Sequence, residues 1–154
     1  MTHRRRAAAV GGDDGQILLL LIGAVLILAL MIAGVVDTSR LYLARRSLDA
    51  VTDAAALAGS QSADLAAVYS GRTGSDVPLD PTAARIAVRR YLEAVDAATA
   101  IHGFDVDAIE VTATEVTVHS HGVVRLPFSG PVMNGRSSVV IRTVATARNH
   151  VRGG

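Results

Sequence analysis

The residues best suited to chemistry are His119 and His121, which flank Ser120 in an alternating apolar and polar run. Side chains at positions i and i+2 of a strand point to the same face of a sheet, as a pair of zinc ligands requires. A zinc site needs at least one further protein ligand, and the available side chains lie at scattered points of the chain: His102, Glu115 and His150. Because two histidines fall short of a ligand set, we interpret them as part of an exposed strand face and predict no metal and no cofactor.

The other reactive residue types follow no catalytic motif. The chain of 154 residues has no Cys, which excludes thiol nucleophiles, thiolate metal sites and disulfides. No Ser has the surroundings of a nucleophile elbow, and Gly71-Arg72-Thr73-Gly74 lacks the Lys and the preceding strand of a phosphate-binding loop. A net charge of +1 gives no basic face for nucleic acid. We therefore predict a protein that is not an enzyme and has no nucleic-acid partner.

A long uncharged run near the N-terminus predicts a membrane helix over residues 16–36. Ile17 to Val36 are twenty residues without a charge, and twenty helical residues span about 30 Å, the thickness of the hydrocarbon core of a bilayer. A cleavable secretory signal, with Arg4 to Arg6 as its basic region, is the first alternative, but its apolar part is usually about 7–15 residues and no Ala-x-Ala site follows here. A buried helix of a soluble domain is the second alternative.

The charges beside this helix are balanced. Three Arg residues precede it and three follow it closely: Arg4, Arg5, Arg6, Arg40, Arg45 and Arg46. A long C-terminal domain can be translocated despite its charges. We therefore expect a single-pass protein of the cytoplasmic membrane, with residues 1–15 in the cytoplasm and the C-terminal domain outside.

Beyond the membrane, an apolar stripe continues along the same helix over residues 37–69. Its members are spaced alternately by three and four residues, which is the pattern of a helix–helix seam: Leu41, Ala44, Leu48, Val51, Ala55 and Ala58. Most of them are small, which permits close approach of another helix. Two interpretations stay open, packing of the stripe on the chain's own C-terminal domain and association with a partner helix.

Asp37, the first charge after the apolar run, lies on this same stripe. A carboxylate at a membrane edge is a candidate functional group. Its simplest role is an interfacial residue paired with Arg40 at i+3. We hypothesise in addition that Asp37 forms a hydrogen bond to a neighbouring helix, since its position aims it at the surface used by the rest of the stripe.

The remainder of the chain predicts a small α+β domain at residues 82–154. Residues 70–81 are rich in turn formers and form a linker, whose end offers Asp80 as an N-cap and Pro81 as the first helical residue. An amphipathic helix then runs to about Ala100. After Gly103 the period changes to two, which predicts a small antiparallel sheet of three or four strands. The strands are expected around Ile109–Ala113, around Val116–His121 with an extension toward Phe128, and around Ser138–Ala147 after an Asn134-Gly135 turn.

The landmarks of residues 15–59 resemble the N-terminal segment of the TadE/TadG-like proteins of the Flp (tight adherence) pilus-assembly system. They are Gly15-Gln16, the apolar span, Asp37 at its end, and Asp53-Ala54-Ala55-Ala56-Leu57-Ala58. The resemblance implies a minor-pilin-like or assembly component, anchored once and facing outward. Its partners would be the lipid bilayer, other pilus-assembly or pseudopilin-like membrane proteins, or further copies of the chain. The long TadG type with a von Willebrand factor A-like domain is excluded by length.

Prepilin peptidase substrates typically carry Glu at the fifth position after the cleaved Gly, but after Gly15, Gly12 and Gly11 that position holds Leu20, Ile17 and Gln16. This difference favours an uncleaved anchor. Three hypotheses follow: a structural component of a pilus or secretion system, which we favour, a membrane-anchored extracytoplasmic binding module for an envelope ligand or partner protein, and an anchored hydrolase or metalloprotein, which the missing motifs disfavour.

Overall fold

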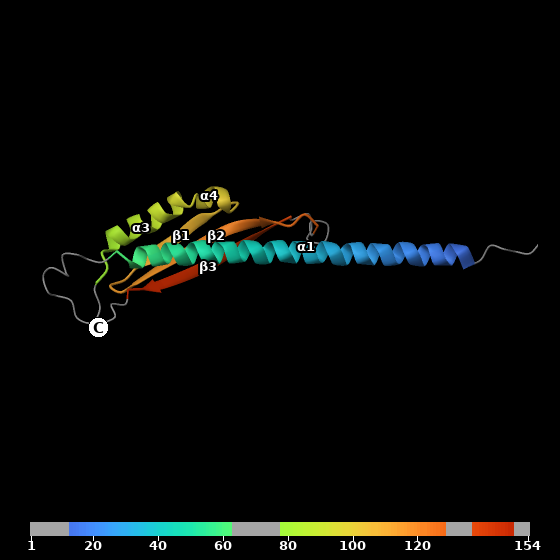
Figure 1. Cartoon of the computed structure of the whole chain (residues 1–154), viewed down its shortest axis with the longest axis horizontal. Coiled ribbons are helices and arrows are strands. Elements are labelled where there is room, and N and C mark those ends of the chain that lie inside the picture. The colour runs from blue at the N-terminus through green and yellow to red at the C-terminus, as the bar shows by residue number, and fades with distance from the viewer. Residues whose placement is uncertain (1–12, 63–77, 129–136, 150–154) are drawn as a thin grey trace, which may run out of the picture.

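The computed structural model describes residues 13–62, 78–128 and 137–149. It contains a long N-terminal helix, two shorter helices and a three-stranded antiparallel sheet (Figure 1). The predicted α+β class, with an apolar helix that extends beyond its membrane-length part, is thereby confirmed.

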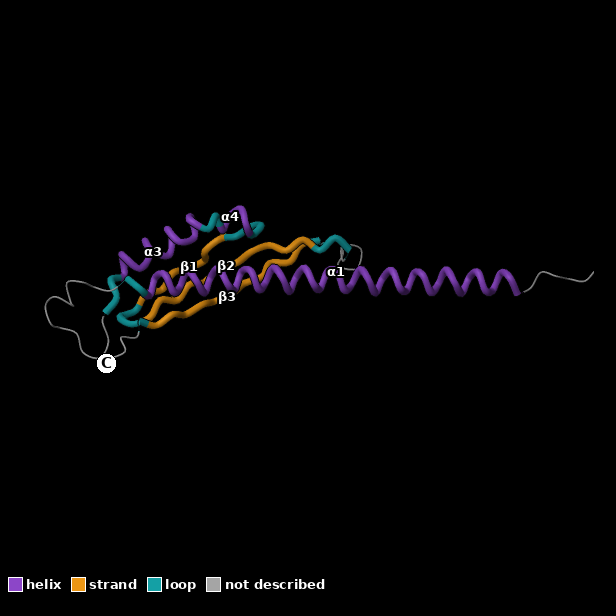
Figure 2. Tube along the Cα trace, in the orientation of Figure 1, coloured by secondary structure: helices purple, strands orange, loops and turns teal. Residues whose placement is uncertain are grey.

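The helix α1 spans Asp13–Ser60, 48 residues, which corresponds to about 72 Å. It contains no Pro and is dominated by Leu, Ile and Ala, so nothing in its sequence interrupts the hydrogen-bond ladder. Figure 2 shows α1 as one continuous helix whose N-terminal half projects alone while its C-terminal half lies along the sheet. At the end of α1 the Ser60 hydroxyl donates to the carbonyl of Leu57 at 2.9 Å. The N-terminal half of α1 therefore projects beyond the domain, whereas its C-terminal half packs against the sheet.

The helix α3 (Pro81–Ala94) begins as the sequence predicts. Asp80 Oδ1 accepts from the backbone N–H groups of Thr82 and Ala83 at 2.8 and 3.1 Å, and Pro81 occupies the first helical position. The expectation of one helix to Ala100 is wrong. The chain adopts a left-handed conformation at Asp96 (φ 48°) and then starts a separate short helix, α4 (Ala97–Ala100). Asp tolerates this conformation better than most residues, and the break allows Ala97 to be buried.

The sheet has the order β1-β2-β3 and is antiparallel throughout: β1 (Asp105–Val111), β2 (Glu115–Arg125) and β3 (Ser138–Arg148). The alternation of apolar and polar residues locates β2 and β3 well. It places β1 too late, because a register shift between Val106 and Ala108 interrupts its alternation. The expected Asn134-Gly135 turn, and the helical continuation over 63–69, lie outside the described residues.

One face of the sheet is covered by both long helices. The C-terminal half of α1 contacts β2 and β3, and α3 contacts α1 and β1. The core between them is built largely from small side chains, including Ala55, Ala56, Ala84, Val88, Val116, Val118 and Ala145. At Gly59 a Cβ atom would lie 2.8 Å from Val88 Cγ2 and 3.0 Å from Val116 Cγ1. This glycine therefore permits the close approach of α1 to α3 and β2.

The opposite face of the sheet carries exposed or half-exposed side chains, among them Val140 and Val144 of β3 and Thr117 of β2. Thr117 Oγ1 and Thr146 Oγ1 form a hydrogen bond across these two strands at 3.0 Å. In the described sheet β3 is an edge strand, paired with β2 over all its 11 residues. Its outer edge is thus a long row of backbone groups.

Candidate functional site: the membrane-proximal surface of α1

The N-terminal half of α1 is an apolar rod. By length and composition α1 is able to cross a membrane, and the most apolar part of the helix makes no burying contact with the rest of the described chain. The large side chains from Ile17 to Val35 are exposed all round the helix, which is the arrangement of a single helix surrounded by lipid. This half of α1 is therefore a candidate transmembrane helix.

The stripe predicted to associate with a helix lies against the chain's own domain. Leu48 and Ala55 are fully buried, and Leu41, Ala44, Val51 and Ala58 are partly buried. Leu48 lies beside Gly122 of β2: a Cβ atom added to that glycine would be 3.9 Å from Leu48 Cδ1. Of the two open interpretations, own-domain packing is the one that the structure describes. Association of these residues with a partner helix stays a prediction.

Thr52, Ala56 and Gly59 are among the buried residues of α1 that sequence periodicity missed. A strict spacing of 3.5 residues drifts by about 20° per heptad around a straight α-helix. Over the length of the stripe this drift places Ala58 at the margin of the helix face that packs on the domain. Ala56 and Gly59 lie closer to the centre of that face. Counting at a period of 3.6 residues would have found them.

Asp37 is only 5% exposed, although it ends the apolar run. Its Oδ1 accepts a hydrogen bond from the backbone N–H of Phe128 at 3.4 Å. Phe128 lies three residues beyond the end of β2 and is itself 53% exposed. Asp37 therefore ties the membrane-proximal end of the sheet to α1, where the helix leaves the apolar run. Contact of Asp37 with a second chain stays a prediction.

Replacing Asp37 with Ala is expected to leave the amount of protein in the membrane fraction unchanged, since loss of a charge only lengthens the apolar run. It should increase the hydrogen-exchange rate of the Phe128 amide about fivefold or more, because that N–H loses a charged acceptor. The measurement is hydrogen exchange by mass spectrometry on the purified full chain. Asp53→Ala, which removes an exposed carboxylate of α1, is the control. Equal exchange at Phe128 in wild type and Asp37→Ala would contradict the tie.

The two histidines of β2 lie on the outer face of the sheet. His121 Nδ1 is 2.9 Å from Asp107 Oδ1, and His119 Nε2 is 3.8 Å from Glu110 Oε1. Of the third ligands considered, Glu115 pairs with Arg148, His102 lies in the turn before β1, and His150 is outside the described residues. In the part of the chain that the structure describes, no group of three metal-ligating side chains converges.

The comparisons with known proteins bear on the N-terminal part of the chain. No curated protein and no solved structure matches. One family model does match, over residues 15–73, and its description is "Putative Flp pilus-assembly TadE/G-like". The match includes the candidate transmembrane helix, Asp37 and the whole stripe. The resemblance expected from the sequence is thus confirmed: residues 15–73 are similar to the TadE/G-like family, and they include the candidate transmembrane helix.

Proposed function

We propose that this protein is a non-catalytic, minor-pilin-like structural or assembly component of a Flp/Tad-type pilus or a related secretion system. It is anchored in the cytoplasmic membrane by the N-terminal half of α1. Residues 1–15 are on the cytoplasmic side, and the domain formed by the rest of α1, α3, α4 and the sheet is outside. The match of residues 15–73 to the TadE/G-like family supports this role.

The observation that carries the proposal is the continuity of α1. Its N-terminal half exposes apolar side chains on every side, and its C-terminal half contributes Leu48, Thr52 and Ala55 to the buried core of the domain. No linker separates the two halves (Figure 2), so membrane anchor and domain form one rigid body. A rigid connection of this kind suits a component that holds a fixed position in an assembly better than a tethered enzyme that must reach a substrate.

The proposal is tested by deleting the gene in its own host and complementing it with the wild-type chain. We expect loss or strong reduction of surface filaments in the deletion strain, counted by electron microscopy, and co-purification of other pilus-assembly proteins with a tagged chain. Normal filaments together with no co-purification would contradict the proposal. Normal filaments with specific capture of an envelope component would favour the alternative of an anchored binding module.

The same strain tests orientation and helix contacts. Protease added to intact spheroplasts should remove a C-terminal tag, and a protected tag would reverse the orientation. A Cys placed at Ala44 gives a clean crosslinking probe, because the chain has no other Cys. Capture of a pilus-assembly protein through this Cys is expected if the partly buried stripe also meets a partner helix. Failure to capture any protein in cells that express the whole system would leave only its packing on the chain's own domain.

A further inference from the structure

Two aromatic side chains are exposed near the end of the apolar run. Among the aromatic residues that the structure describes, Tyr91 and Phe104 pack against the hydrophobic core. Tyr42 on α1 is 64% exposed, and Phe128, beyond the end of β2, is 53% exposed. Aromatic rings are enriched at the two membrane–water interfaces of membrane proteins. The height of these two rings relative to a bilayer is therefore informative.

The hydrogen bond to Asp37 fixes the height of Phe128. Asp37 directly follows Val36, the last residue of the apolar run, and one helical residue is about 1.5 Å along the axis. Side chains of a helix lean toward its N-terminus, which for α1 is toward the lipid, and the Asp37 carboxylate accepts from the Phe128 N–H at 3.4 Å. The interfacial region adds about 5–8 Å to the hydrocarbon core on each side. When α1 spans a bilayer, the backbone of Phe128 thus lies in the interfacial layer, and its exposed ring lies in that layer or directly beside it.

Tyr42 lies on another side of α1. It is five residues beyond Asp37, which is a rotation of about 140° around the helix and places it about 9 Å beyond Val36 along the axis. Its side chain leans back toward the N-terminus, so the ring extends toward the outer part of the same layer. The two exposed rings therefore lie on different sides of α1 at the level of the headgroups, one carried by the helix and one by the domain.

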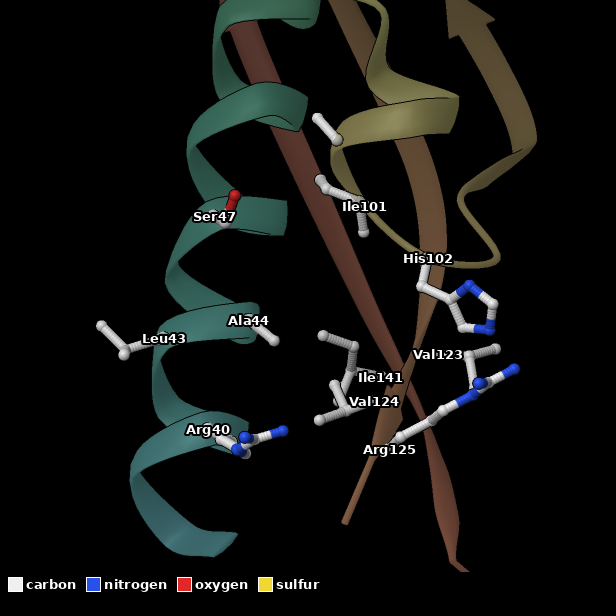
Figure 3. A pocket seen from close by; sticks show the side chains of 11 residues that line it. Arg40, Leu43, Ala44, Ser47, Ile101, His102, Val123, Val124, Arg125 and Ile141 are labelled. Atoms are coloured by element: carbon white, nitrogen blue, oxygen red, sulfur yellow. The ribbon is translucent and has the colours of Figure 1, made fainter. Parts of the chain in front are cut away.

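The nearest exposed charges of α1 and β2 are basic. Beyond Asp37 the first charged residue of α1 is Arg40, the last charged residue of β2 is Arg125, and both are exposed. Figure 3 shows them on separate elements, with Arg125 pointing away from α1, so each acts independently of the other. An exposed Arg near a bilayer is attracted to the anionic lipids of its surface. The charge at this end of the domain therefore favours contact with a membrane surface.

We propose that the domain makes a second contact with the bilayer, in which the ring of Phe128 inserts into the headgroup layer of the leaflet from which α1 emerges. Tyr42 anchors the helix in the same layer from another side. Interfacial anchors of this kind set the tilt and the rotation of a transmembrane helix, so the domain stands in one orientation on the membrane. The inference requires only that α1 is embedded in a bilayer, and not that the protein builds pili.

The experiment uses a single Trp as a probe of depth, because the chain has no Trp of its own. The full chain with Phe128→Trp is reconstituted in phosphatidylcholine vesicles, with iodide added on both sides in a parallel sample. We expect emission at a shorter wavelength than that of Trp in water, loss of most of this emission when the lipids carry bromine in the upper part of their acyl chains, and weak quenching by iodide.

Two further variants are the controls. Leu57 is 54% exposed, as Phe128 nearly is, and lies 20 residues beyond Asp37 on α1, which is about 30 Å farther from the membrane. Leu57→Trp should therefore be quenched by iodide and not by brominated lipid. Leu26→Trp, within the apolar run, reports insertion of α1 and should be quenched by bromine near the ends of the acyl chains.

Three results would overturn the inference. If Phe128→Trp responds to iodide and bromine as Leu57→Trp does, the ring lies in water; with Leu26→Trp still quenched, the anchor stands and only the second contact fails. Short-wavelength emission that bromine does not quench, and that disappears when the protein is diluted in lipid, would assign the surface to a second copy of the chain. Absence of bromine quenching in Leu26→Trp would remove the anchor and the inference together.

A second probe covers the case in which the larger Trp ring perturbs the domain. A nitroxide attached to Phe128→Cys is the only label on the chain, because the sequence has no other Cys. Collisions of the nitroxide with oxygen, which concentrates in lipid, should exceed those with a water-soluble nickel complex, and the reverse should hold for Leu57→Cys. Equal collision ratios at the two positions would contradict the contact.

Discussion

Replacing Leu48 with Ala is expected to lower the free energy of unfolding of the domain by about 2–5 kcal/mol. Leu48 is 0% exposed and is one of the largest fully buried side chains among the described residues. It fills the space beside Gly122, where β2 has no side chain of its own. Truncation would remove three carbon atoms from this contact and leave a cavity, which neighbours fixed on a rigid helix and a sheet cannot collapse to fill.

The measurement is denaturant unfolding of the detergent-solubilised full chain, followed by circular dichroism and by hydrogen exchange of β2 and β3. Leu43→Ala is the matched control, because the same residue type on the same helix is 63% exposed and its truncation should change stability by less than about 0.5 kcal/mol. Similar losses in the two variants would show that Leu48 does not pack on the sheet.

Replacing Thr52 with Val is expected to cost about 1–3 kcal/mol, although the two side chains have nearly the same shape. Thr52 and Ser120 are each 1% exposed, and their hydroxyl oxygens are 2.6 Å apart. The Thr52 hydroxyl donates its proton to the carbonyl of Leu48 at 2.8 Å, so Ser120 is the donor in the bond between the two hydroxyls. Thr52→Val would therefore leave the Ser120 hydroxyl buried without its acceptor.

The direction of this bond predicts an asymmetry between the single variants. In Ser120→Ala the Thr52 hydroxyl keeps its bond to Leu48, so the loss should be smaller than in Thr52→Val. In the double variant Thr52→Val/Ser120→Ala no buried hydroxyl remains unpaired, and part of the loss should be recovered. A double-mutant cycle by the same unfolding measurement tests this. Strict additivity of the two single effects would contradict the coupling.

The sequence predicts those parts of the fold that depend on local pattern. Twenty uncharged residues identify the apolar half of α1, the Asp80-Pro81 pair identifies the start of α3, and the alternation of β-branched with polar residues identifies β2 and β3. Each of these signals is contained within one continuous segment of the chain. The break at Asp96 leaves no such signal, because a left-handed Asp inside an Ala-rich helical pattern is selected by the burial of Ala97 in the tertiary structure.

The candidate site was predictable only in part, for the same reason. Periodicity identifies which residues share a face of α1, but it contains no information about what covers that face. The covering residues come from distant sequence: Ser120 is 68 positions from Thr52, and Phe128 is 91 positions from Asp37. Contacts at such separations require the fold.

The direction of β3 limits how copies of the chain can meet. β2 runs opposite to α1, because Val116 near its start lies close to Gly59 and Phe128 beyond its end contacts Asp37. β3 is antiparallel to β2 and therefore runs in the same direction as α1 (Figure 1). Copies anchored in one bilayer with the same orientation all present β3 pointing away from the lipid. Their outer edges can then adjoin only as parallel strands, the less stable pairing, since antiparallel pairing would require one copy to be inverted. Insertion of all copies in one orientation thus excludes the more stable, antiparallel self-pairing of this long edge strand, and a domain cut free of its anchor loses that restriction.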